Sequence, residues 1–585
     1  MSEGKWCHRV LLPVAVALVM AIVAAFGVAS TSVAEEGDPD VSGYLNNQTA
    51  NLTVKDVEKG VTGTAYKYLE VQWNTSENVP TLPEYEFANG VTQWVRRNFS
   101  SYIKTRNNAP TEKFRTLGTS DMRDFSDKLL AAIEKNDVVF RESDSTSTAS
   151  AENGSINFNL KMGGYLIKLS NGPNCVYQPI ATYVRPKSKG DGKTYELEAG
   201  TVEGKAEAKS MKIASTKTVK RKDKDTVNGD GQAAYGQIGD SFIFTIKTPI
   251  PNYPDNAVNK EFIVKDQPTS GLTITTTSIK VMIEGGEELI ENTNYSTKTI
   301  DPDRSNNRDM GFKVIFDKMQ YEDKLAKAGK GSKKLVVTYT GTLNNKAAIM
   351  RGTKNSAHPL IPKEFYKPDT EYTSPTPADT EIHTYGVKIT KIGKTGKGSY
   401  KKKIELPGAQ FELRRKGEKG RTEVHVKQQE ATDAGEGATT GKYVVQPDSG
   451  GGATTTITSG PNGLVQIDGL GAGTYILKEI KAPEGGYALP GKSIKIVIND
   501  SDINGVPDTA ADNNLGSEPS TIAGKSVSLD DENRLVYEFV NRKANFKLPK
   551  TGAIGAAIFG VVGVALIVTS AALVIAHRRK NKRSS

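Results

Sequence analysis

Cysteine is almost absent from this chain. Only two of its 585 residues are cysteines, Cys7 and Cys175. Because Cys7 lies in an N-terminal segment that we expect to be removed, Cys175 has no second cysteine with which to pair in the mature chain. We therefore expect a protein that does not depend on disulfides, with Cys175 buried and inert.

Histidine is also scarce, with five residues scattered along the chain. The sequence contains no nucleophile elbow, no metal-ligand spacing and no phosphate-binding loop. An enzymatic role therefore finds little support, and we expect neither a cofactor nor a metal. The net charge of +10 comes from interspersed Lys and Arg without aromatic-rich basic patches, and part of the excess lies at the two ends. This pattern does not indicate a nucleic-acid partner.

Long apolar runs occur only near the ends. The first, Val10 to Ala29, follows the basic residues Lys5 and Arg9 and precedes the small residues Ser32-Val33-Ala34. A basic start, an apolar run and a small-residue cleavage site are typical of a secretory signal peptide. We therefore predict that residues 1–34 are a signal peptide and that the protein is secreted.

The second apolar run, residues 553–576, carries no charge. It is long enough to cross a bilayer as a helix, so we predict a C-terminal transmembrane helix there. The basic segment 577–585 would remain on the cytoplasmic side. The pentapeptide Leu548-Pro549-Lys550-Thr551-Gly552 (548–552) would then lie just outside the membrane.

Between these ends the pattern predicts a mainly β protein, with strand-type alternation and abundant Thr, Val, Gly and Tyr. The length suggests three domains. We place a mixed α/β N-terminal domain at 35–186, an all-β domain at 187–372 and a further β domain at 385–545. In the first domain, Thr119-Ser120-Asp121 caps a predicted helix over 122–135.

The C-terminal pentapeptide, apolar run and basic tail resemble the cell-wall sorting signal of Gram-positive surface proteins. In that family a sortase, a membrane-bound cysteine transpeptidase, recognises the pentapeptide that here begins with Leu548 and Pro549. The resemblance implies cleavage between Thr551 and Gly552. The sortase would hold the Thr551 carbonyl as a thioester and pass it to an amine.

The third domain resembles the collagen-adhesin B-type (Cna-B) family. Tyr475–Tyr487 matches the family's E-box with one extra glycine before the tyrosine, and Leu406–Leu413 matches its second strand. In such domains a first-strand lysine and a last-strand asparagine are joined by an isopeptide bond. The E-box glutamate, here Glu479, promotes the reaction.

Alternation within the strands selects the lysine and the asparagine. In the segment 387–391, side chains two residues apart share a face, which places Lys391 inward with apolar neighbours and Lys388 outward. In the segment 537–541 the same rule places Asn541 inward. We therefore expect Lys391, Asn541 and Glu479 to converge among apolar side chains.

The chemistry of this cluster would follow from burial, because desolvation disfavours the charged forms of an amine and a carboxyl alike. A neutral Lys391 amine can attack the side-chain carbonyl of Asn541. A protonated Glu479 can donate a hydrogen bond to that carbonyl and transfer protons as ammonia leaves. This catalysis would be a single turnover of the chain on itself.

The second domain resembles the immunoglobulin-like middle domain of backbone pilins, through the segments Ile238–Phe242, Phe262–Leu272 and Val337–Asn344. The resemblance implies tandem immunoglobulin-like β-sandwich domains. It also implies a second cross-link, with Lys217 as the amine and Asp266 as the promoting acid. Asn355 would be the amide. Alternatives remain open for two of these roles: Asn344 or Asn345 for the amide and Asp240 for the acid.

Subunit polymerisation in that family also needs an acceptor lysine. Tyr183-Val184-Arg185-Pro186-Lys187 resembles the family's pilin motif, whose core is Val-Tyr-Pro-Lys, and it lies directly ahead of the middle domain. The resemblance implies Lys187 as the acceptor, with Lys189 as the alternative. An acceptor must enter a sortase cleft, so we expect an exposed lysine in a loop at the domain boundary.

Together these resemblances indicate the major, shaft-forming subunit of a sortase-assembled pilus on a Gram-positive cell wall. The implied partners are pilin-specific and housekeeping sortases, identical subunits, minor pilins, peptidoglycan and a host surface ligand. The alternative is a monomeric cell-wall-anchored adhesin, with the B-type domain as its stalk. That alternative would need the pentapeptide but no acceptor at Lys187.

Overall fold

The computed structural model describes most of the chain outside its N-terminus. The described residues are 45–140, 146–190, 194–199, 202–203, 210–223, 231–347, 352–395, 402–417, 420–429, 440–447, 451–491, 493–509, 516–518, 528–543 and 551–581. The predicted signal peptide, residues 1–34, lies outside them. Strands dominate the described residues, as the alternation predicts.

The first domain combines sheets with helices. One sheet has the order β3-β2-β6-β8-β9 with β4 paired to β2, and smaller sheets have the orders β10-β1-β5 and β11-β7. The strands are β1 (Ala50–Lys55), β2 (Thr62–Asn74), β3 (Val79–Phe87), β4 (Thr146–Ser150), β5 (Ser155–Leu160), β6 (Gly163–Leu169), β7 (Cys175–Tyr177), β8 (Ile180–Ser188), β9 (Tyr195–Ala199), β10 (Val202–Glu203) and β11 (Ser210–Lys212). Cys175 is buried in the core of this domain, as expected.

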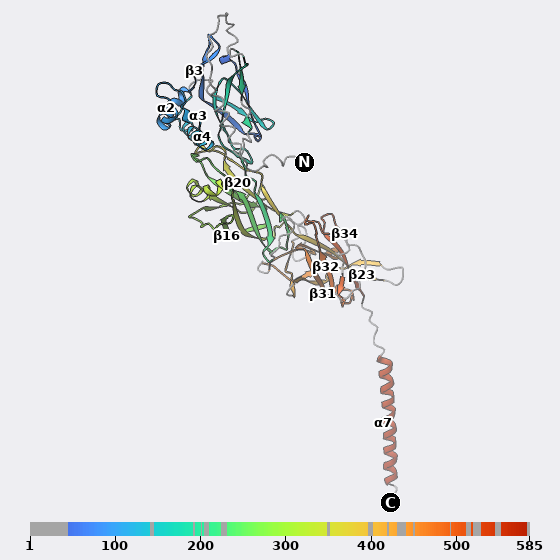
Figure 1. The fold of residues 1–585 in the computed structure, drawn as a ribbon. Coiled ribbons are helices and arrows are strands. Elements are labelled where there is room, and N and C mark those ends of the chain that lie inside the picture. Colours follow the sequence, from blue (N-terminus) through green and yellow to red (C-terminus); the bar gives the residue numbers. More distant parts are fainter. Residues whose placement is uncertain are drawn as a thin grey trace. The chain divides into compact units, whose positions relative to one another are not determined.

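Three helices lie close together beside the strands of the first domain (Figure 1). They are α2 (Asn89–Asn98), α3 (Glu112–Arg115) and α4 (Thr119–Glu134), with short 3-10 turns η2 (Leu45–Asn47) and η3 (Ser100–Tyr102). The sequence predicts α4 over 122–135, but the helix already begins at Thr119, and its N-cap is Gly118, so the predicted capping residues lie inside its first turn. Its buried Phe125 contacts an aromatic cluster that includes Phe114 and Phe87, which anchors the helices to the sheet.

The strands β9, β10 and β11 pair with strands of the first domain. The sheets of this domain therefore continue to Lys212, past the predicted boundary at residue 186. The predicted boundary at residue 186 is therefore wrong. Pro186 lies within β8, at a position where a proline does not end the strand.

The middle domain is a sandwich of two sheets. Their orders are β12-β14-β19-β16 and β13-β22-β20-β15-β18-β17, with β21 paired to β20. The strands are β12 (Thr216–Arg221), β13 (Ala233–Tyr235), β14 (Ser241–Pro249), β15 (Phe262–Pro268), β16 (Leu272–Ile283), β17 (Ser296–Ile300), β18 (Gly311–Phe316), β19 (Lys334–Leu343), β20 (Thr353–Pro362), β21 (Tyr372–Thr373) and β22 (Ala378–His383). A helical segment joins β18 to β19, with α5 (Lys318–Gln320), η5 (Tyr321–Leu325) and α6 (Ala326–Lys330). Because β22 pairs with β20 and β13, this domain extends past its predicted end at residue 372.

Strand alternation builds the core of this sandwich. In β14 the buried residues are every second one, which gives Phe242, Phe244 and Ile246 a common inward face. The facing sheet contributes Phe262 and Val264 from β15. Any polar side chain on these inner faces is therefore held among apolar neighbours.

The third domain is also built from two sheets. Their orders are β27-β28-β30-β23-β35-β34, with β24 paired to β23, and β26-β25-β31-β32-β33, with β29 paired to β25. The strands are β23 (Tyr385–Thr395), β24 (Lys402–Glu405), β25 (Gln410–Gly417), β26 (Gly420–Glu423), β27 (Val426–Gln428), β28 (Lys442–Val445), β29 (Thr456–Thr458), β30 (Leu464–Leu470), β31 (Gly473–Lys481), β32 (Ser493–Ile498), β33 (Gly516–Glu518), β34 (Ser528–Leu529) and β35 (Leu535–Arg542), with the turn η6 (Pro461–Gly463). The first strand, β23, and the last, β35, are parallel neighbours.

The C-terminal helix α7 (Thr551–Asn581) begins at the threonine of the pentapeptide. Among the residues that the structure describes, no helix is both long and apolar enough to span a membrane. Leu548 and Pro549 lie outside the described residues, and for Thr551 and Gly552 the backbone alone is described.

Candidate functional site

Three polar side chains meet inside the third domain. The Lys391 Nζ donates to Glu479 Oε2 at 2.8 Å and also to Asn541 Oδ1. The Asn541 Nδ2 in turn donates to Glu479 Oε1 at 2.7 Å. The three groups thus form a closed ring of hydrogen bonds in which the amine touches both the amide and the carboxyl.

Strand register produces this meeting. Lys391 lies on β23, and Asn541 lies two positions beyond its direct neighbour Phe539 on the parallel strand β35. Glu479 lies on β31 in the facing sheet. As the alternation predicts, Lys391 points inward, whereas Lys388 has a side chain that is 41% exposed and pairs with Asp530.

Aromatic rings surround the Lys391 amine. Its Nζ lies 3.9 Å from the centre of the Phe539 ring and 5.7 Å from that of Phe411. Desolvation lowers the pKa of Lys391 from 10.5 to about 8, although the hydrogen bond and charge of Glu479 act in the opposite direction. The cluster therefore holds an amine that loses its proton far more readily than an exposed lysine does.

A second cluster lies inside the middle domain. The Lys217 Nζ on β12 donates to Asp266 Oδ2 on β15 at 2.5 Å. The Tyr339 hydroxyl on β19 donates to the other carboxylate oxygen, Asp266 Oδ1, at 2.8 Å. The Asn355 Nδ2 on β20 donates to that same hydroxyl at 2.8 Å. Lys217 and Tyr339 belong to one sheet, and Asp266 and Asn355 belong to the other.

The residues of this second cluster are as deeply buried as those of the first. The exposed fractions of Lys217, Asp266, Tyr339 and Asn355 are 2%, 0%, 1% and 0%. Burial lowers the pKa of Lys217 from 10.5 to about 8, while the charge of Asp266 opposes the shift. The two clusters therefore share a buried amine, a carboxyl and an amide, but in the second a tyrosine hydroxyl lies between the carboxyl and the amide.

The alternatives that the sequence leaves open lie away from this cluster. Asn344 follows the end of β19, where its Nδ2 donates to the Thr273 hydroxyl at 3.0 Å, and the next residue, Asn345, is exposed. Asp240 precedes β14 and forms an ion pair with Arg221 at 3.0 Å. Among the candidates, the structure brings Asn355 and Asp266 into the buried cluster.

Two residues of these sites are missed by sequence reasoning. Tyr339 belongs to the segment that resembles the pilin family, but sequence reasoning assigns it no role. Strand alternation places Tyr339 inward on β19, facing the polar groups of the cluster, and this could have indicated a role for its hydroxyl. The other is Glu198, which contacts Lys187.

Lys187 lies in strand β8, not in the loop that the sequence predicts, because β9 pairs with this part of β8 as a hairpin. Its side chain is 54% exposed, and its Nζ forms an ion pair with Glu198 Oε1 at 3.1 Å. Arg185 on the same strand binds Glu198 Oε2 at 2.6 Å. Partial burial acts to raise the pKa of Glu198, but the hydrogen bonds and charges of Arg185 and Lys187 outweigh it and lower that pKa.

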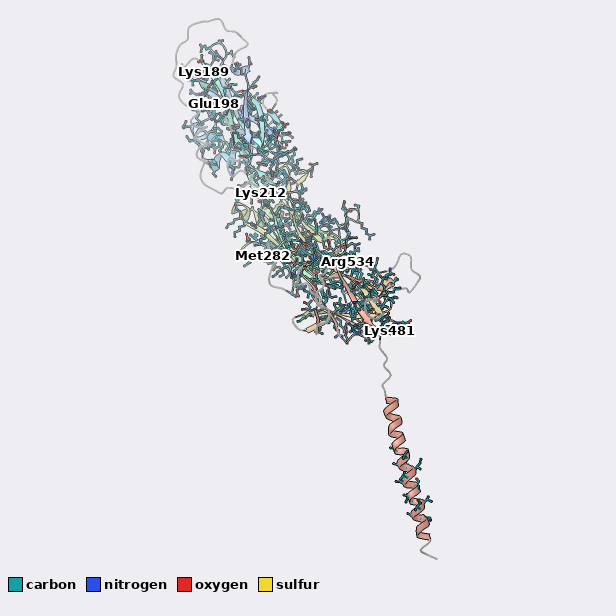
Figure 2. All side chains as sticks on the ribbon, turned by 90° about the vertical axis from the view of Figure 1, so that its right-hand side faces the viewer. Lys189, Glu198, Lys212, Met282, Lys481 and Arg534 are labelled. Atoms are coloured by element: carbon teal, nitrogen blue, oxygen red, sulfur yellow. The ribbon has the colours of Figure 1, made fainter. Side chains whose placement is uncertain are left out.

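The alternative acceptor, Lys189, directly follows β8, and its backbone N–H donates to the Thr194 carbonyl at 2.9 Å. Lys189 and Glu198 are labelled in Figure 2 and belong to the same hairpin. Both lysines are exposed, so each is open to a sortase. Within the described residues, Lys187 is the one of the two whose amine forms an ion pair with a carboxylate.

Comparisons with known proteins agree with these features. The family model of the SpaA prealbumin-like fold domain matches residues 386–510. The model of the LPXTG cell wall anchor motif matches residues 541–582. The trypsin-resistant surface T6 protein of Streptococcus pyogenes serotype M6 is 22% identical, over 96% of this chain and 99% of its own length.

The fimbrial subunit type 1 of Actinomyces viscosus is 25% identical, over 59% of this chain and 62% of its own length. Among solved structures, the T6 backbone pilin of serotype M6 Streptococcus pyogenes has a modular three-domain structure. It superposes with a TM-score of 0.52 and 19% identity over 85% of this chain and 99% of that one. These matches support a backbone pilin with a cell wall anchor motif.

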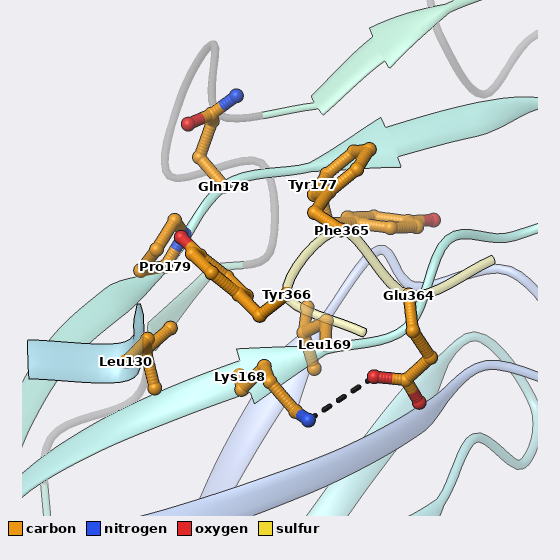
Figure 3. A pocket seen from close by; sticks show the side chains of 9 residues that line it. All are labelled: Leu130, Lys168, Leu169, Tyr177, Gln178, Pro179, Glu364, Phe365 and Tyr366. Carbon is orange, nitrogen blue, oxygen red and sulfur yellow. Dashed lines mark ion pairs between the residues drawn. The ribbon is translucent and has the colours of Figure 1, made fainter. Parts of the chain in front are cut away.

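Within this chain, the first and middle domains belong to one compact unit. The Asp127 side chain on α4 accepts from the Tyr366 hydroxyl at 2.5 Å and from the backbone and side chain of Asn256 at 2.8 and 3.0 Å. Close by, Lys168 pairs with Glu134 and Glu364, and Figure 3 shows the second of these pairs beside Tyr366. The contacts of Asp127 and the Lys168–Glu364 pair therefore join the two domains.

Proposed function

We propose that this pilin is the repeating subunit of a pilus shaft in which covalent bonds replace hydrogen bonds as the path of mechanical force. The observation that carries the proposal is the buried contact of Lys391, Glu479 and Asn541 between the first and last strands of the third domain. A charged amine in a dry core costs free energy unless it is paired or neutralised. A covalent bond to Asn541 removes that charge permanently.

In the proposed reaction, the neutral Lys391 Nζ attacks the side-chain carbonyl carbon of Asn541. The new C–N bond replaces the bond to Nδ2, which leaves as ammonia with the proton that the amine gives up. Glu479 contacts both nitrogens, so it can accept a proton from one and deliver it to the other. Each bond formed this way lowers the mass of the chain by about 17 Da, the mass of ammonia.

The same reaction is proposed for Lys217 and Asn355 in the middle domain, with Asp266 as the acid. Lys217 lies on the first strand of one sheet and Asn355 lies in the other sheet, so this bond would join the two halves of the sandwich. Most of the middle domain lies between Lys217 and Asn355 in the sequence, so the bond would enclose most of its strands. Pulling on the chain would then load the cross-link before it loads the sheets.

Between subunits, we propose a bond from Thr551 to Lys187. A sortase thiol would take over the Thr551 carbonyl as a thioester and release the segment that starts at Gly552. The Lys187 amine of the next subunit would attack this thioester and free the thiol. The exposure of Lys187 on the β8–β9 hairpin supports this role, and the final transfer to peptidoglycan would use an amine of the wall in the same way.

The decisive experiment compares cell walls from bacteria that produce wild type, Lys187→Arg or Lys189→Arg. Wall extracts are boiled in denaturant and separated on gels, and this pilin is detected by antibody. We expect a ladder of high-mass species in wild type and Lys189→Arg, and a monomer in Lys187→Arg. Arginine keeps the charge and the contact with Glu198 but cannot serve as the nucleophile.

A ladder that persists in Lys187→Arg and disappears in Lys189→Arg would show that Lys189 is the acceptor. A monomer in every strain would contradict the shaft and support a monomeric wall-anchored adhesin. The variants differ from wild type at single exposed side chains, so all strains are expected to produce the same total amount of folded subunit.

A further inference from the structure

The two lysine clusters differ in how the acid reaches the amide. In the third domain, the Glu479 carboxylate contacts the Lys391 and Asn541 nitrogens directly, at 2.8 and 2.7 Å. In the middle domain, the acid is Asp266, whose side chain is one methylene shorter. There the Tyr339 hydroxyl stands between Asp266 and Asn355, at 2.8 Å from each.

The Tyr339 hydroxyl is held in this place by its ring. The ring stacks on Phe244 with centroids 5.2 Å apart at 11°, and it meets the edge of Phe312 at 4.9 Å and 76°. The residue is 1% exposed. A ring fixed between two others leaves the hydroxyl little freedom to leave the carboxylate and the amide.

The Asn355 amide depends on this hydroxyl. Its Nδ2 is the leaving group of the proposed reaction, and it donates to Tyr339. Within the part of the chain that the structure describes, the Asn355 Oδ1 has no hydrogen-bond partner. The described contact between the acid and the leaving group therefore runs through Tyr339.

We propose that Tyr339 is a catalytic residue of cross-link formation in the middle domain, where its hydroxyl passes a proton from Asp266 to the leaving nitrogen of Asn355. This inference rests on the proposed Lys217–Asn355 bond. Attack by the neutral Lys217 amine forms the new C–N bond and transfers one amine proton to Asp266. Asp266 gives a proton to the tyrosine oxygen as the tyrosine proton moves to Nδ2, the C–Nδ2 bond breaks, and ammonia leaves. Tyr339 and Asp266 end as they began.

A matched pair of variants tests this relay. Tyr339→Phe removes the hydroxyl and keeps the ring between Phe244 and Phe312. Asp266→Glu in the Tyr339→Phe background adds the methylene that Asp266 lacks and fills the space left by the oxygen. The double variant would reproduce the arrangement of the third domain, in which Glu479 reaches the amide without a hydroxyl.

The full chain is pulse-labelled in a strain without sortase, isolated at intervals and digested, and the Lys217–Asn355 cross-linked peptide is quantified by mass spectrometry. The Lys391–Asn541 peptide of the same molecules serves as the internal control for export and folding. We expect Tyr339→Phe to slow the middle-domain bond by about 100-fold or more, in the range of general acid–base catalysis, with the control bond unchanged. We expect the double variant to recover most of the rate.

A Tyr339→Phe chain that forms the middle-domain bond at the wild-type rate would overturn the relay, and so would a double variant no faster than the single one. Absence of the peptide in wild type would instead refute the proposed cross-link itself. Phe244→Leu disturbs the same ring stack but keeps the hydroxyl. If Tyr339 served packing alone, Phe244→Leu would slow the bond as much as Tyr339→Phe does, whereas the relay predicts a smaller effect.

Discussion

At the scale of single residues, burial alone does not turn a lysine into a nucleophile. Lys217 and Lys391 have pKa values lowered to about 8, because desolvation outweighs the opposing effect of the carboxylates near them. Lys168 is also partly buried, and desolvation acts on it in the same direction. Its neighbours Tyr66, Glu134 and Glu364 outweigh that effect and raise its pKa. The charged form of Lys168 is therefore favoured, which distinguishes it from the other two lysines.

This difference predicts how cross-linking depends on pH. Below about pH 8, the Lys391 amine of the folded chain is protonated and cannot attack, and above about pH 8 it is neutral. The rate of bond formation in freshly folded chain should therefore rise about tenfold per pH unit up to about pH 8. Chain isolated unfolded from inclusion bodies is refolded at about pH 6, 7 and 8, and its intact mass measured over time checks this.

The control for this series is Glu479→Gln, which keeps the shape of the side chain but cannot shuttle the proton. It should lack the third-domain mass loss at each pH while keeping that of the middle domain. A rate in wild type that stays constant from acid to neutral pH would show that deprotonation of Lys391 does not limit the reaction.

At the scale of elements, close approach of neighbouring segments positions the strand that carries the buried Lys391. Gly463 ends the turn η6 with a φ of +64°, and a Cβ there would lie 2.2 Å from the Lys391 carbonyl oxygen on β23. Glycine is required both for the positive φ and for this approach. The turn before β30 thus presses against the backbone of the strand that carries the lysine.

Gly463→Ala should therefore lower the stability of the third domain by more than the strain of a positive φ alone, which is about 1–2 kcal/mol. The matched control is Gly408→Ala, at a φ of +80° with no atom within 4 Å of the added Cβ. Denaturant unfolding of both variants in the Glu479→Gln background measures the difference without the cross-link. Equal losses in the two variants would contradict a role for the close approach.

At the scale of the whole molecule, the chain divides into two compact units, and the first contains both the first and the middle domain. The contacts that join these domains are polar and buried, with Asp127 at 4% exposure. Buried hydrogen bonds to a charged group are expensive to break, because the remaining charge stays in the core. We therefore expect a force applied at the β8–β9 hairpin to be transmitted to the middle domain through the contacts of Asp127.

Tyr366→Phe removes one of the hydrogen bonds to Asp127 and should cost about 1–3 kcal/mol of stability in this unit. The melting temperature, measured by scanning calorimetry, should fall by roughly 2–4 °C for each kcal/mol. Tyr372→Phe is the control, because the Tyr372 hydroxyl also donates to a carboxylate, Glu261, but at an exposed position. A melting temperature as high in Tyr366→Phe as in Tyr372→Phe would show that the Asp127 contact does not stabilise the unit.

Local sequence rules predicted a large part of this molecule. Period-two alternation separated Lys391 from Lys388, because side chains in a strand alternate between the two faces whatever the strand packs against. Apolar residues at helical spacing predicted α4, although its N-cap is Gly118 and not the predicted cap. Family motifs pointed to Lys217, Asp266 and Asn355. The same rules put Lys187 in a loop, since the pairing of β8 with β9 depends on residues further along the chain.

The sequence by itself determined the mainly β class, the inward faces of the strands and the amine, acid and amide of the third-domain cluster, whereas in the middle domain it left alternatives for the acid and the amide. Those features depend on neighbours along one strand or on short motifs. The tertiary structure decided the extent of the domains, the contact of Glu198 with Lys187 and the place of Tyr339 between Asp266 and Asn355. Each of these joins residues from separate strands, and for Tyr339 from facing sheets, so each depends on how the strands pair and the sheets pack, which no local pattern encodes.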